Sequence, residues 1–402
     1  MTKTIAIIGT LDTKGPDFAF LKAEIEKRGC ATLMIDTAIL GDPYFTPDIP
    51  REQVAEAGGK PLAALIAERD RGEAVTVMTK GIAEVVRRLY AEGRIDGIIG
   101  MGGSGGTIIS TSGMRALPVG FPKVMVSTVA SGDTSPYVGT TDITMIPSIV
   151  DVSGVNSISR RIYTNAAGAI CGMVMSEVTA GDDKPLIAAS MFGNTTRAVN
   201  QARELLEQAG YEVLVFHATG TGGKTMEALI DAGFIKGVLD ITTTEWADEV
   251  CGGVLSAGPT RLDAAAKRGV PQVVVPGCID MCNFWAPDTV PAKFKDRKFY
   301  QWNPNITLMR TTPEENARMG QIFAQKLNAA TGPVVVLIPL GGWSELDLPG
   351  KAFYWPEANA AFINALKANL RPDIQVIEMA EDINDPAFSS KTAQTLMDML
   401  KS

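Results

Sequence analysis

The stretch GIIGMGGSGGT, residues 97–107, places a short apolar run directly before a loop with glycine at positions 100, 102, 103, 105 and 106. Glycine has no Cβ, so its backbone N–H groups can approach a phosphate closely, and a helix that follows adds favourable partial charge. A loop that only turns tightly needs one or two glycines. The stretch therefore predicts a buried strand that ends in a ligand-binding loop, and with it an α/β fold.

The rest of the chain repeats this alternation of short β-branched apolar runs with longer amphipathic stretches. The alternation is typical of βαβ units and of a mainly parallel sheet. So many strands fit two sheets better than one, and we predict two Rossmann-like subdomains, each a mainly parallel sheet flanked by helices. The predicted strands are 4–8, 31–35, 74–78, 97–100, 123–127, 186–189, 212–216, 237–240, 272–275 and 333–338.

A weak internal similarity marks two halves of the same kind. TIAIIGTLDTK followed by RGCATLMID in the first half matches PLIAASMFGNTT followed by AGYEVLVFH in the second. Between them, TAGDDKP at 179–185 is polar and rich in residues that break regular structure. We predict an N-terminal domain over 1–180, closed by one long helix over 157–177, and a C-terminal domain over 185–402.

Composition limits the classes of function. The net charge of −8 argues against a nucleic-acid partner, because that binding depends on basic side chains. The N-terminus MTKTIAIIGTLDTKG has too short an apolar run for a signal peptide or a membrane helix, so we expect a cytoplasmic protein with no membrane partner. Five scattered cysteines and a single histidine predict buried thiols, with neither a disulfide framework nor a metal site.

Three patterns compete for the glycine-rich loop. Gly100-x-Gly102-x-x-Gly105 matches the dinucleotide fingerprint, but the next strand ends at Val126 and Ser127, where an acid should meet the ribose. The remaining interpretation that involves a nucleotide is a phosphate cradle formed by four consecutive residues, Gly103, Ser104, Gly105 and Gly106.

The third pattern, Gly102-x-Ser104-x-Gly106, matches the nucleophile elbow of serine hydrolases. Asp133 or Asp142 could supply the acid and His217 the base, in a triad that would span both domains. Asp133 and Asp142 lie in the long polar stretch STVASGDTSPYVGTTD, residues 127–142, and are its only carboxylates, so they are also the acid/base candidates of this loop. A capped surface loop explains the same stretch equally well.

Further charged residues follow other predicted strands of the first half. GTLDTKG places Asp12, Thr13 and Lys14 at the carboxyl end of the first strand, where open α/β sheets bind ligands. Lys14 could meet a phosphate and Asp12 a hydroxyl or a Mg²⁺-bound water, although Asp12 or Thr13 could equally cap a helix. ERDRGEAVTVMTKG places Arg71 just before the strand predicted over 74–78.

In the second half, HATGTGGKT at 217–225 follows an apolar run and nearly matches the phosphate-loop pattern. We interpret it instead as one wall of a second cleft, because the loop at 97–107 is the better cradle. Polar segments after the other strands should collect at the same sheet edge and bring together His217, Glu245, Asp280 and Glu345. The run KFKDRKFYQW at 293–302 predicts a solvated flap rather than a nucleic-acid surface.

Several of these segments together resemble one known family. GTLDTK, GMGGSGGT, KVMVSTVASGDTSPYVGTTD, FHATGTGG, TTTEWADE and NPNITLMRTTPEE are similar to segments of the ATP-binding domain family named after the tomato mosaic virus resistance protein. The resemblance extends over nearly the whole chain. It implies two Rossmann-like subdomains, a homodimer, and ATP held in the first subdomain.

Carried over motif by motif, the resemblance assigns the ATP contacts to Asp12, Thr13, Lys14, Arg71 and the four cradle residues, Gly103, Ser104, Gly105 and Gly106. A further contact falls on Thr37 to Ile39, where IDTAIL departs from the tomato pattern. We therefore expect an ATP-binding protein whose C-terminal cleft receives a second small molecule, such as a small acid. A non-catalytic, nucleotide-dependent interaction module and a serine hydrolase using Ser104 are the alternatives, and the catalytic candidates are Asp133, Asp142, His217 and Glu245.

Overall fold

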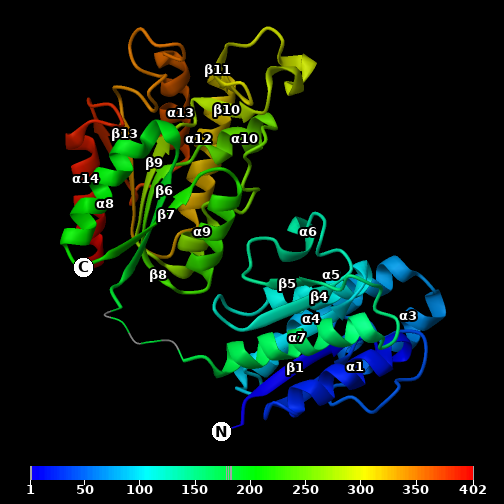
Figure 1. Ribbon diagram of the computed structural model, residues 1–402. Coiled ribbons are helices and arrows are strands. Elements are labelled where there is room, and N and C mark those ends of the chain that lie inside the picture. Colours follow the sequence, from blue (N-terminus) through cyan, green and yellow to red (C-terminus); the bar gives the residue numbers. More distant parts are fainter. Residues whose placement is uncertain (1, 178, 180, 182, 402) are drawn as a thin grey trace. The chain divides into compact units, whose positions relative to one another are not determined.

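The structure is a computed structural model that describes residues 2–177, 179, 181 and 183–401. Its internal contacts divide the chain into two compact units, Met1–Thr179 and Ala180–Ser402, which we call unit 1 and unit 2. Each unit is an α/β structure with its own parallel sheet, so the predicted fold class is confirmed. Figure 1 shows the elements of both units along the chain.

Unit 1 is built on a five-stranded sheet in the order β2-β1-β3-β4-β5, with every strand pair parallel. Helices cover both faces: α1 and α7 pack on one side, and α2, α3, α4 and α5 pack on the other (Figure 1). The order reverses between β1 and β3, which makes this point the topological switch of the sheet. The elements are β1 (Thr4–Gly9), α1 (Leu11–Glu26), β2 (Ala31–Asp36), α2 (Arg51–Ala57), α3 (Leu62–Glu68), α4 (Arg71–Ala91), β3 (Gly97–Gly102), α5 (Ser104–Arg115), β4 (Lys123–Ser127), α6 (Ser135–Val138), β5 (Thr144–Pro147) and α7 (Ser157–Met175).

One predicted strand of unit 1 is wrong. Residues 74–78 belong to α4, a helix of 21 residues, and Arg71 therefore lies at the start of this helix rather than before a strand. Asp70 caps the helix by accepting hydrogen bonds from the N–H groups of Gly72 and Glu73. Its buried positions, from Ala74 to Leu89, follow the helical spacing of three and four residues. That periodicity outweighs the strand preference of the two valines in this segment.

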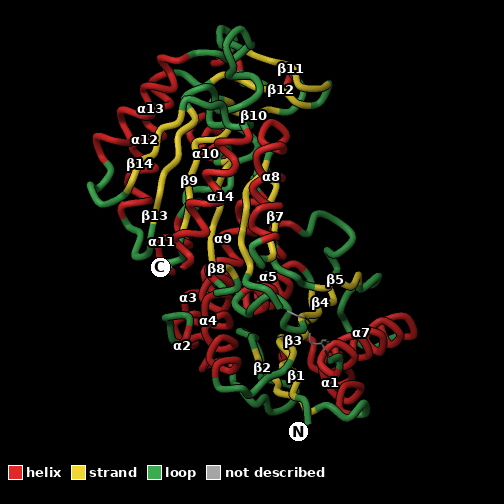
Figure 2. Tube along the Cα trace, turned by 90° about the vertical axis from the view of Figure 1, so that its left-hand side faces the viewer, coloured by secondary structure: helices red, strands yellow, loops and turns green. Residues whose placement is uncertain are grey.

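Unit 2 has a six-stranded parallel sheet in the order β14-β13-β9-β8-β6-β7, which Figure 2 shows as the larger group of yellow strands. Helices α8 and α14 cover one face, and α9 to α13 cover the other. The elements are β6 (Leu186–Met191), η1 (Gly193–Thr195), α8 (Thr196–Gln208), β7 (Glu212–His217), α9 (Thr221–Asp231), β8 (Ile235–Thr242), α10 (Glu245–Cys251), α11 (Asp263–Arg268), β9 (Gln272–Gly277), β10 (Met281–Phe284), η2 (Pro287–Thr289), η3 (Ala292–Phe294), β11 (Phe299–Asn303), β12 (Ile306–Arg310), α12 (Pro313–Asn328), β13 (Val334–Pro339), α13 (Pro356–Asn369), β14 (Gln375–Met379) and α14 (Pro386–Lys401).

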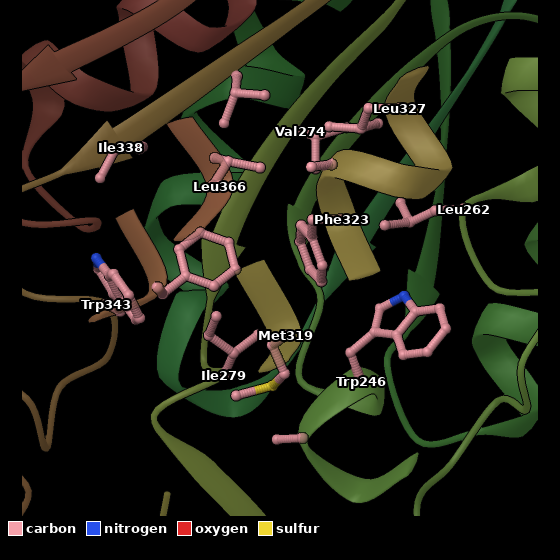
Figure 3. Packing of buried hydrophobic residues seen from close by; sticks show 14 of the residues in the cluster. Trp246, Leu262, Val274, Ile279, Met319, Phe323, Leu327, Ile338, Trp343 and Leu366 are labelled. Carbon is pink, nitrogen blue, oxygen red and sulfur yellow. The ribbon is translucent and has the colours of Figure 1, made fainter. Parts of the chain in front are cut away.

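The largest buried cluster of unit 2 is rich in aromatic rings (Figure 3). Phe323 contacts Trp246 and Phe362 with ring centroids 6.5 and 5.2 Å apart, and Phe362 contacts Trp343 at 5.4 Å. All three contacts have the edge-to-face geometry that aromatic pairs prefer. These rings fix α10, α12 and α13 against the sheet.

A small antiparallel sheet, β10-β12-β11, is a feature that the sequence did not predict. It starts shortly after β9 and ends just before α12, so it is an insertion between two elements of the parallel core. The segment predicted as a solvated flap, 293–302, supplies most of its outer strand β11. The flap therefore has regular structure, and its tip is next to a cleft described below.

Candidate functional sites

A cleft of about 850 Å³ opens at the carboxyl edge of the unit 1 sheet, at the switch between β1 and β3. This is where doubly wound sheets place their ligands. The loops after β1, β2 and β3 and the start of α4 form its walls. All ten residues predicted to contact a nucleotide line this cleft: Asp12, Thr13, Lys14, Thr37, Ile39, Arg71, Gly103, Ser104, Gly105 and Gly106.

The glycine-rich loop leads directly into α5. Gly103 precedes the helix in an extended conformation, and no side chain caps the first turn. The N–H groups at the start of an α-helix have no partner within the helix, so this first turn can accept an anion. A Cβ on Gly102 would lie 3.0 Å from the Cα of Gly106, which explains the glycine at that close approach. A Cβ on Gly105 would lie 3.9 Å from a guanidinium nitrogen of Arg71, so this position faces the cleft.

Arg71 is a cation of the cleft that is available to a ligand. It is exposed at the first position of α4, and among the described residues it forms no ion pair. The preceding Arg69 also lines the cleft and ends α3 in the left-handed conformation, with φ of 53°. Arg71 faces Gly105 of the glycine-rich loop, and the two arginines outnumber Asp70, which lies between them in sequence and also lines the cleft.

The residues after β1 are held in place by neighbouring backbone. The Asp12 carboxylate accepts hydrogen bonds from the N–H groups of Leu40 and Gly41, both at 3.2 Å. Lys14 interrupts the helical conformation of α1, and its ammonium group donates a hydrogen bond to the carbonyl oxygen of Val152. Asp12 thus ties the loop after β1 to the loop after β2, and Lys14 is partly engaged by the protein itself.

Apolar side chains also line the cleft. Ile39, Leu65, Ile66, Val75 and Ile109 line it from the loop after β2 and from helices α3, α4 and α5. An anion-accepting end beside an apolar end matches a ligand that carries a phosphate and a planar base.

Asp36, which the sequence analysis did not single out, organises the floor beside this cleft. It ends β2, is fully buried, and accepts hydrogen bonds from the N–H groups of Leu11 (3.1 Å) and Ala38 (3.0 Å) through one oxygen. The other oxygen has no partner among the described residues. Burial raises the pKa of Asp36. An acid at the end of the second strand of a βαβ unit is the signal that would have identified it.

The phosphate-loop-like stretch of unit 2, at 217–225, already holds an anion that belongs to the protein. The Glu245 carboxylate accepts hydrogen bonds from the N–H groups of Gly220 (2.8 Å) and Gly223 (3.0 Å) at the start of α9. Its second oxygen forms an ion pair with the buried Arg261 at 2.7 Å. Arg261 also forms a bidentate ion pair with Asp240. A Cβ on Gly223 would collide with the Glu245 carboxylate. The Glu245 carboxylate therefore occupies this anion site, and its hydrogen bonds and ion pair give it a structural role.

Two other acid/base candidates are also engaged locally. Asp142 pairs with the buried Lys123 at 2.7 Å and accepts a hydrogen bond from the N–H of Gly120. Asp133 accepts hydrogen bonds from the backbone and hydroxyl of Ser135, as a capped surface loop would. Neither carboxylate lines the cleft of unit 1.

The nucleophile elbow does not match the conformation of the loop. An elbow places the serine on a sharp, strained turn between strand and helix. Ser104 is instead the first residue of α5 and is not among the described residues with positive φ.

A second cleft, of about 400 Å³, lies at the carboxyl ends of β6 and β7. His217 lines it, as predicted, but Glu245, Asp280 and Glu345 do not. Asp280 is buried against Ser344, whose hydroxyl donates to it at 2.7 Å, and Glu345 pairs with Arg197 at 3.6 Å. The expectation of one cleft containing all four residues is therefore wrong, because Glu245, Asp280 and Glu345 are held by partners from other segments of unit 2. The lining residues are Phe192, Gly193, Asn194, His217, Thr219, Leu255, Trp285, Trp302, Asn303, Ile306 and Leu308.

All five cysteines are free thiols and buried, as expected from their spacing. Within the described part of the chain, no group of three or more His, Cys, Asp or Glu side chains is arranged to hold a metal ion. Over the same residues, none of the helices is both long and apolar enough to span a bilayer.

Fold and clefts together define the class of protein: an α/β chain of two doubly wound units, with an open helix N-terminus in the first and a filled one in the second. The chain belongs to the uncharacterised protein family UPF0261. The family's N-terminal domain matches residues 3–179 and its C-terminal domain matches residues 184–400. The two matches meet where the structure divides.

Relatives confirm this membership and the resemblance to the tomato proteins. A UPF0261 protein of Clostridium tetani is 53% identical over the full length of both chains, and one of Rhizobium meliloti is 46% identical over 99% of both. The ToMV resistance protein Tm-1(GCR237) of tomato is 42% identical over 82% of this chain and 45% of its own length. Among solved structures, a UDP-N-acetylglucosamine 2-epimerase from Rickettsia bellii matches 100% of this chain and 96% of its own, at 11% identity and a TM-score of 0.24, too low to support any functional argument.

Proposed function

We propose that unit 1 binds ATP, with the phosphates on the first turn of α5 and the base in the apolar part of the cleft. The observation that carries this proposal is the open helix N-terminus facing Arg71 inside a cleft of about 850 Å³. Phosphate bound there gains both the unpaired N–H groups and the positive end of the helix. Arg71 adds a charge-assisted hydrogen bond from a side chain without a competing carboxylate.

Asp12 is the carboxylate best placed to assist a magnesium ion that accompanies the phosphates. Its Oδ2 atom is bound to backbone N–H groups. Magnesium at nucleotide sites keeps most of its shell as water and phosphate oxygen, so one or two protein carboxylates suffice. The absence of a preformed acidic cluster in the described residues is compatible with this arrangement.

The second cleft is proposed to take a second small molecule, with ATP or its hydrolysis coupled to that ligand. A cytoplasmic location and a homodimer are proposed as well. The supporting observation for two ligands is that the loops of unit 2 provide a separate cleft and a filled anion cradle, so the nucleotide and the second molecule would not compete.

Calorimetric titration with ATP tests the site. Gly105→Val should abolish binding, because its side chain would enter the space between the helix terminus and Arg71. Lys224→Ala is the matched control: Lys224 is the exposed lysine of the phosphate-loop-like stretch on α9, and its loss should leave the affinity unchanged.

The opposite pattern, with binding lost in Lys224→Ala and retained in Gly105→Val, would refute the proposed site. ATP binding without phosphate release, with or without a pool of metabolites, would support the non-catalytic interaction module instead of an enzyme. Labelling of Ser104 by a fluorophosphonate would restore the hydrolase alternative.

A further inference from the structure

The second cleft is lined by aromatic rings from two different layers of unit 2. Phe192 follows β6 and His217 ends β7, with ring centroids 6.0 Å apart. Trp285 follows β10 and Trp302 lies on β11, so both belong to the small antiparallel sheet. A Cβ on Gly193 would lie 3.7 Å from the indole of Trp302, so this ring reaches back over the edge of the parallel sheet.

Both tryptophans remain accessible to solvent. Trp285 is 50% exposed and Trp302 is 45% exposed, although each borders the same cleft. Indole rings carry much of the apolar surface that proteins use to bind ligands, and a cleft with several such rings is a typical small-molecule site. Their exposure is explained if a flat ligand covers them.

The charges around the cleft restrict the ligand. Among the residues that the structure describes, no lysine, arginine, aspartate or glutamate lines this cleft. A charged ligand would lose its hydration there without meeting an opposite charge, which is unfavourable. This argues against the small acid expected from the sequence, and the rings contributed by both layers favour a flat aromatic ligand over a sugar.

One polar group of the cleft lacks a partner. Asn194 is 1% exposed, and its Nδ2 faces the Met281 sulfur at 3.7 Å, while its Oδ1 has no hydrogen-bond partner among the described residues. A buried acceptor left unpaired is costly. The hydroxyl of Thr219 and the imidazole of His217 add further polar groups at the sheet side of the cleft.

From these observations we infer that the second cleft binds an uncharged aromatic compound with an N–H donor, such as an aromatic carboxamide. Its ring stacks on Trp302 and Trp285, and its polar edge meets Asn194 in η1, shortly after β6. This inference rests on the proposed function in one respect: it gives a chemical class to the second ligand.

Saturation-transfer NMR on the full chain tests the inference with three probes: benzamide, benzoate and methyl glucoside. Benzamide should bind with a dissociation constant of about millimolar, the range expected for so small a ligand. Benzoate has the same ring and a negative charge, and should bind on the order of tenfold more weakly. Methyl glucoside should give no signal.

Two variants locate the probe. Trp302→Ala removes a half-exposed ring and should weaken benzamide binding on the order of tenfold without unfolding the unit. Gly193→Leu keeps both tryptophans but fills the space under the indole and should have at least the same effect. Phe234→Ala is the matched control. Phe234 is 40% exposed and lies just before β8, at the amino-terminal ends of the strands, whereas the cleft lies at their carboxyl ends.

Preferential binding of benzoate or methyl glucoside would overturn the inference, as would equal benzamide binding by Trp302→Ala, Gly193→Leu and the wild type. Calorimetry with ATP on the same samples separates the two proposals. Lost benzamide binding with normal ATP binding would refute only the chemical class, whereas normal benzamide binding without ATP binding would refute only the nucleotide site.

Discussion

Glu245 shows how one side chain decides the role of a loop. Its carboxylate occupies the N–H groups of Gly220 and Gly223, which a phosphate would otherwise use. The corresponding turn in unit 1 has no such side chain, and the nearest charged group is a guanidinium. Two loops that look similar in sequence therefore differ in chemistry: one is closed by an internal anion, and the other is open to an external one.

We expect the Arg71 side chain to contribute directly to the affinity for ATP. Arg71→Ala should weaken ATP binding by about 1.5–3 kcal/mol, the usual contribution of a hydrogen bond to a charged group. Arg87→Ala is the control, since Arg87 is exposed on the same helix and pairs with Glu84. Calorimetry measures both. Equal affinities for the two variants would show that Arg71 does not contact the nucleotide.

At Asp248 we expect a pH effect on stability. Burial raises the pKa of Asp248 from 3.8 to about 7, so the folded chain keeps a proton that the unfolded chain has lost. The contribution of the Asp248 carboxyl to the free energy of unfolding is fully present below about pH 4. It decreases as the pH rises toward 7, by at most about 1.4 kcal/mol per pH unit. Asp248→Asn should remove this decline.

The amide is compatible with the site. Asn283 donates to Asp248 at 2.7 Å, and its own Oδ1 has no partner among the described residues. With the Asn283 amide turned over, this oxygen would accept from the new asparagine. Urea unfolding at pH 5, 6, 7 and 8 gives the comparison, and parallel pH profiles for wild type and variant would contradict the assignment.

At the scale of elements, the loop between β7 and α9 depends on the buried ion pairs. Glu245→Ala should destabilise unit 2 by about 3–5 kcal/mol, because it leaves the buried Arg261 and two N–H groups without a partner. Glu204→Ala, at an exposed position of α8, should change the stability by less than about 0.5 kcal/mol. Urea unfolding followed by circular dichroism measures both, and a Glu245→Ala effect as small as the control would mean that the cradle is not structural.

The sequence predicted most of the parallel strands because short β-branched runs bounded by glycine or polar residues usually form buried strands. It failed at residues 74–78, where β-branched residues lie inside a helix whose cap at Asp70 and apolar spacing were the better signals. It also missed the antiparallel sheet, whose three strands are only four or five residues long and whose outer strand β11 is mostly exposed. Turn chemistry and periodicity carried more information than residue type alone.

The sequence also predicted one candidate site better than the other. Nine of the ten residues predicted for the nucleotide follow strands whose ends the topology must bring to one edge, whereas Arg71 begins α4, and all ten line one cleft. The second site was predicted less well, because Glu245 and Asp280 also follow strands but turn inward to ion pairs and hydrogen bonds. Which strand-end carboxylates face a cleft depends on long-range partners, and no local pattern reports those.

For the whole molecule, the two units have separate sheets and separate cores, so their stabilities should respond separately to ligands. ATP at about 100 times its dissociation constant should stabilise unit 1 by about 2.7 kcal/mol. In differential scanning calorimetry, only one transition should move upward by several degrees, and Glu245→Ala should lower only the other one. A single transition that both changes move would show that the units unfold together.

The most direct test of the central claim is photolabelling of the full chain with 8-azido-ATP, followed by mapping of the labelled peptides. We expect label in unit 1, in the cleft wall around residues 37–40 and 65–75, and its loss when excess ATP or the Gly105→Val substitution is present. Label that excess ATP suppresses in residues 217–225 of unit 2, with none in unit 1, would contradict it.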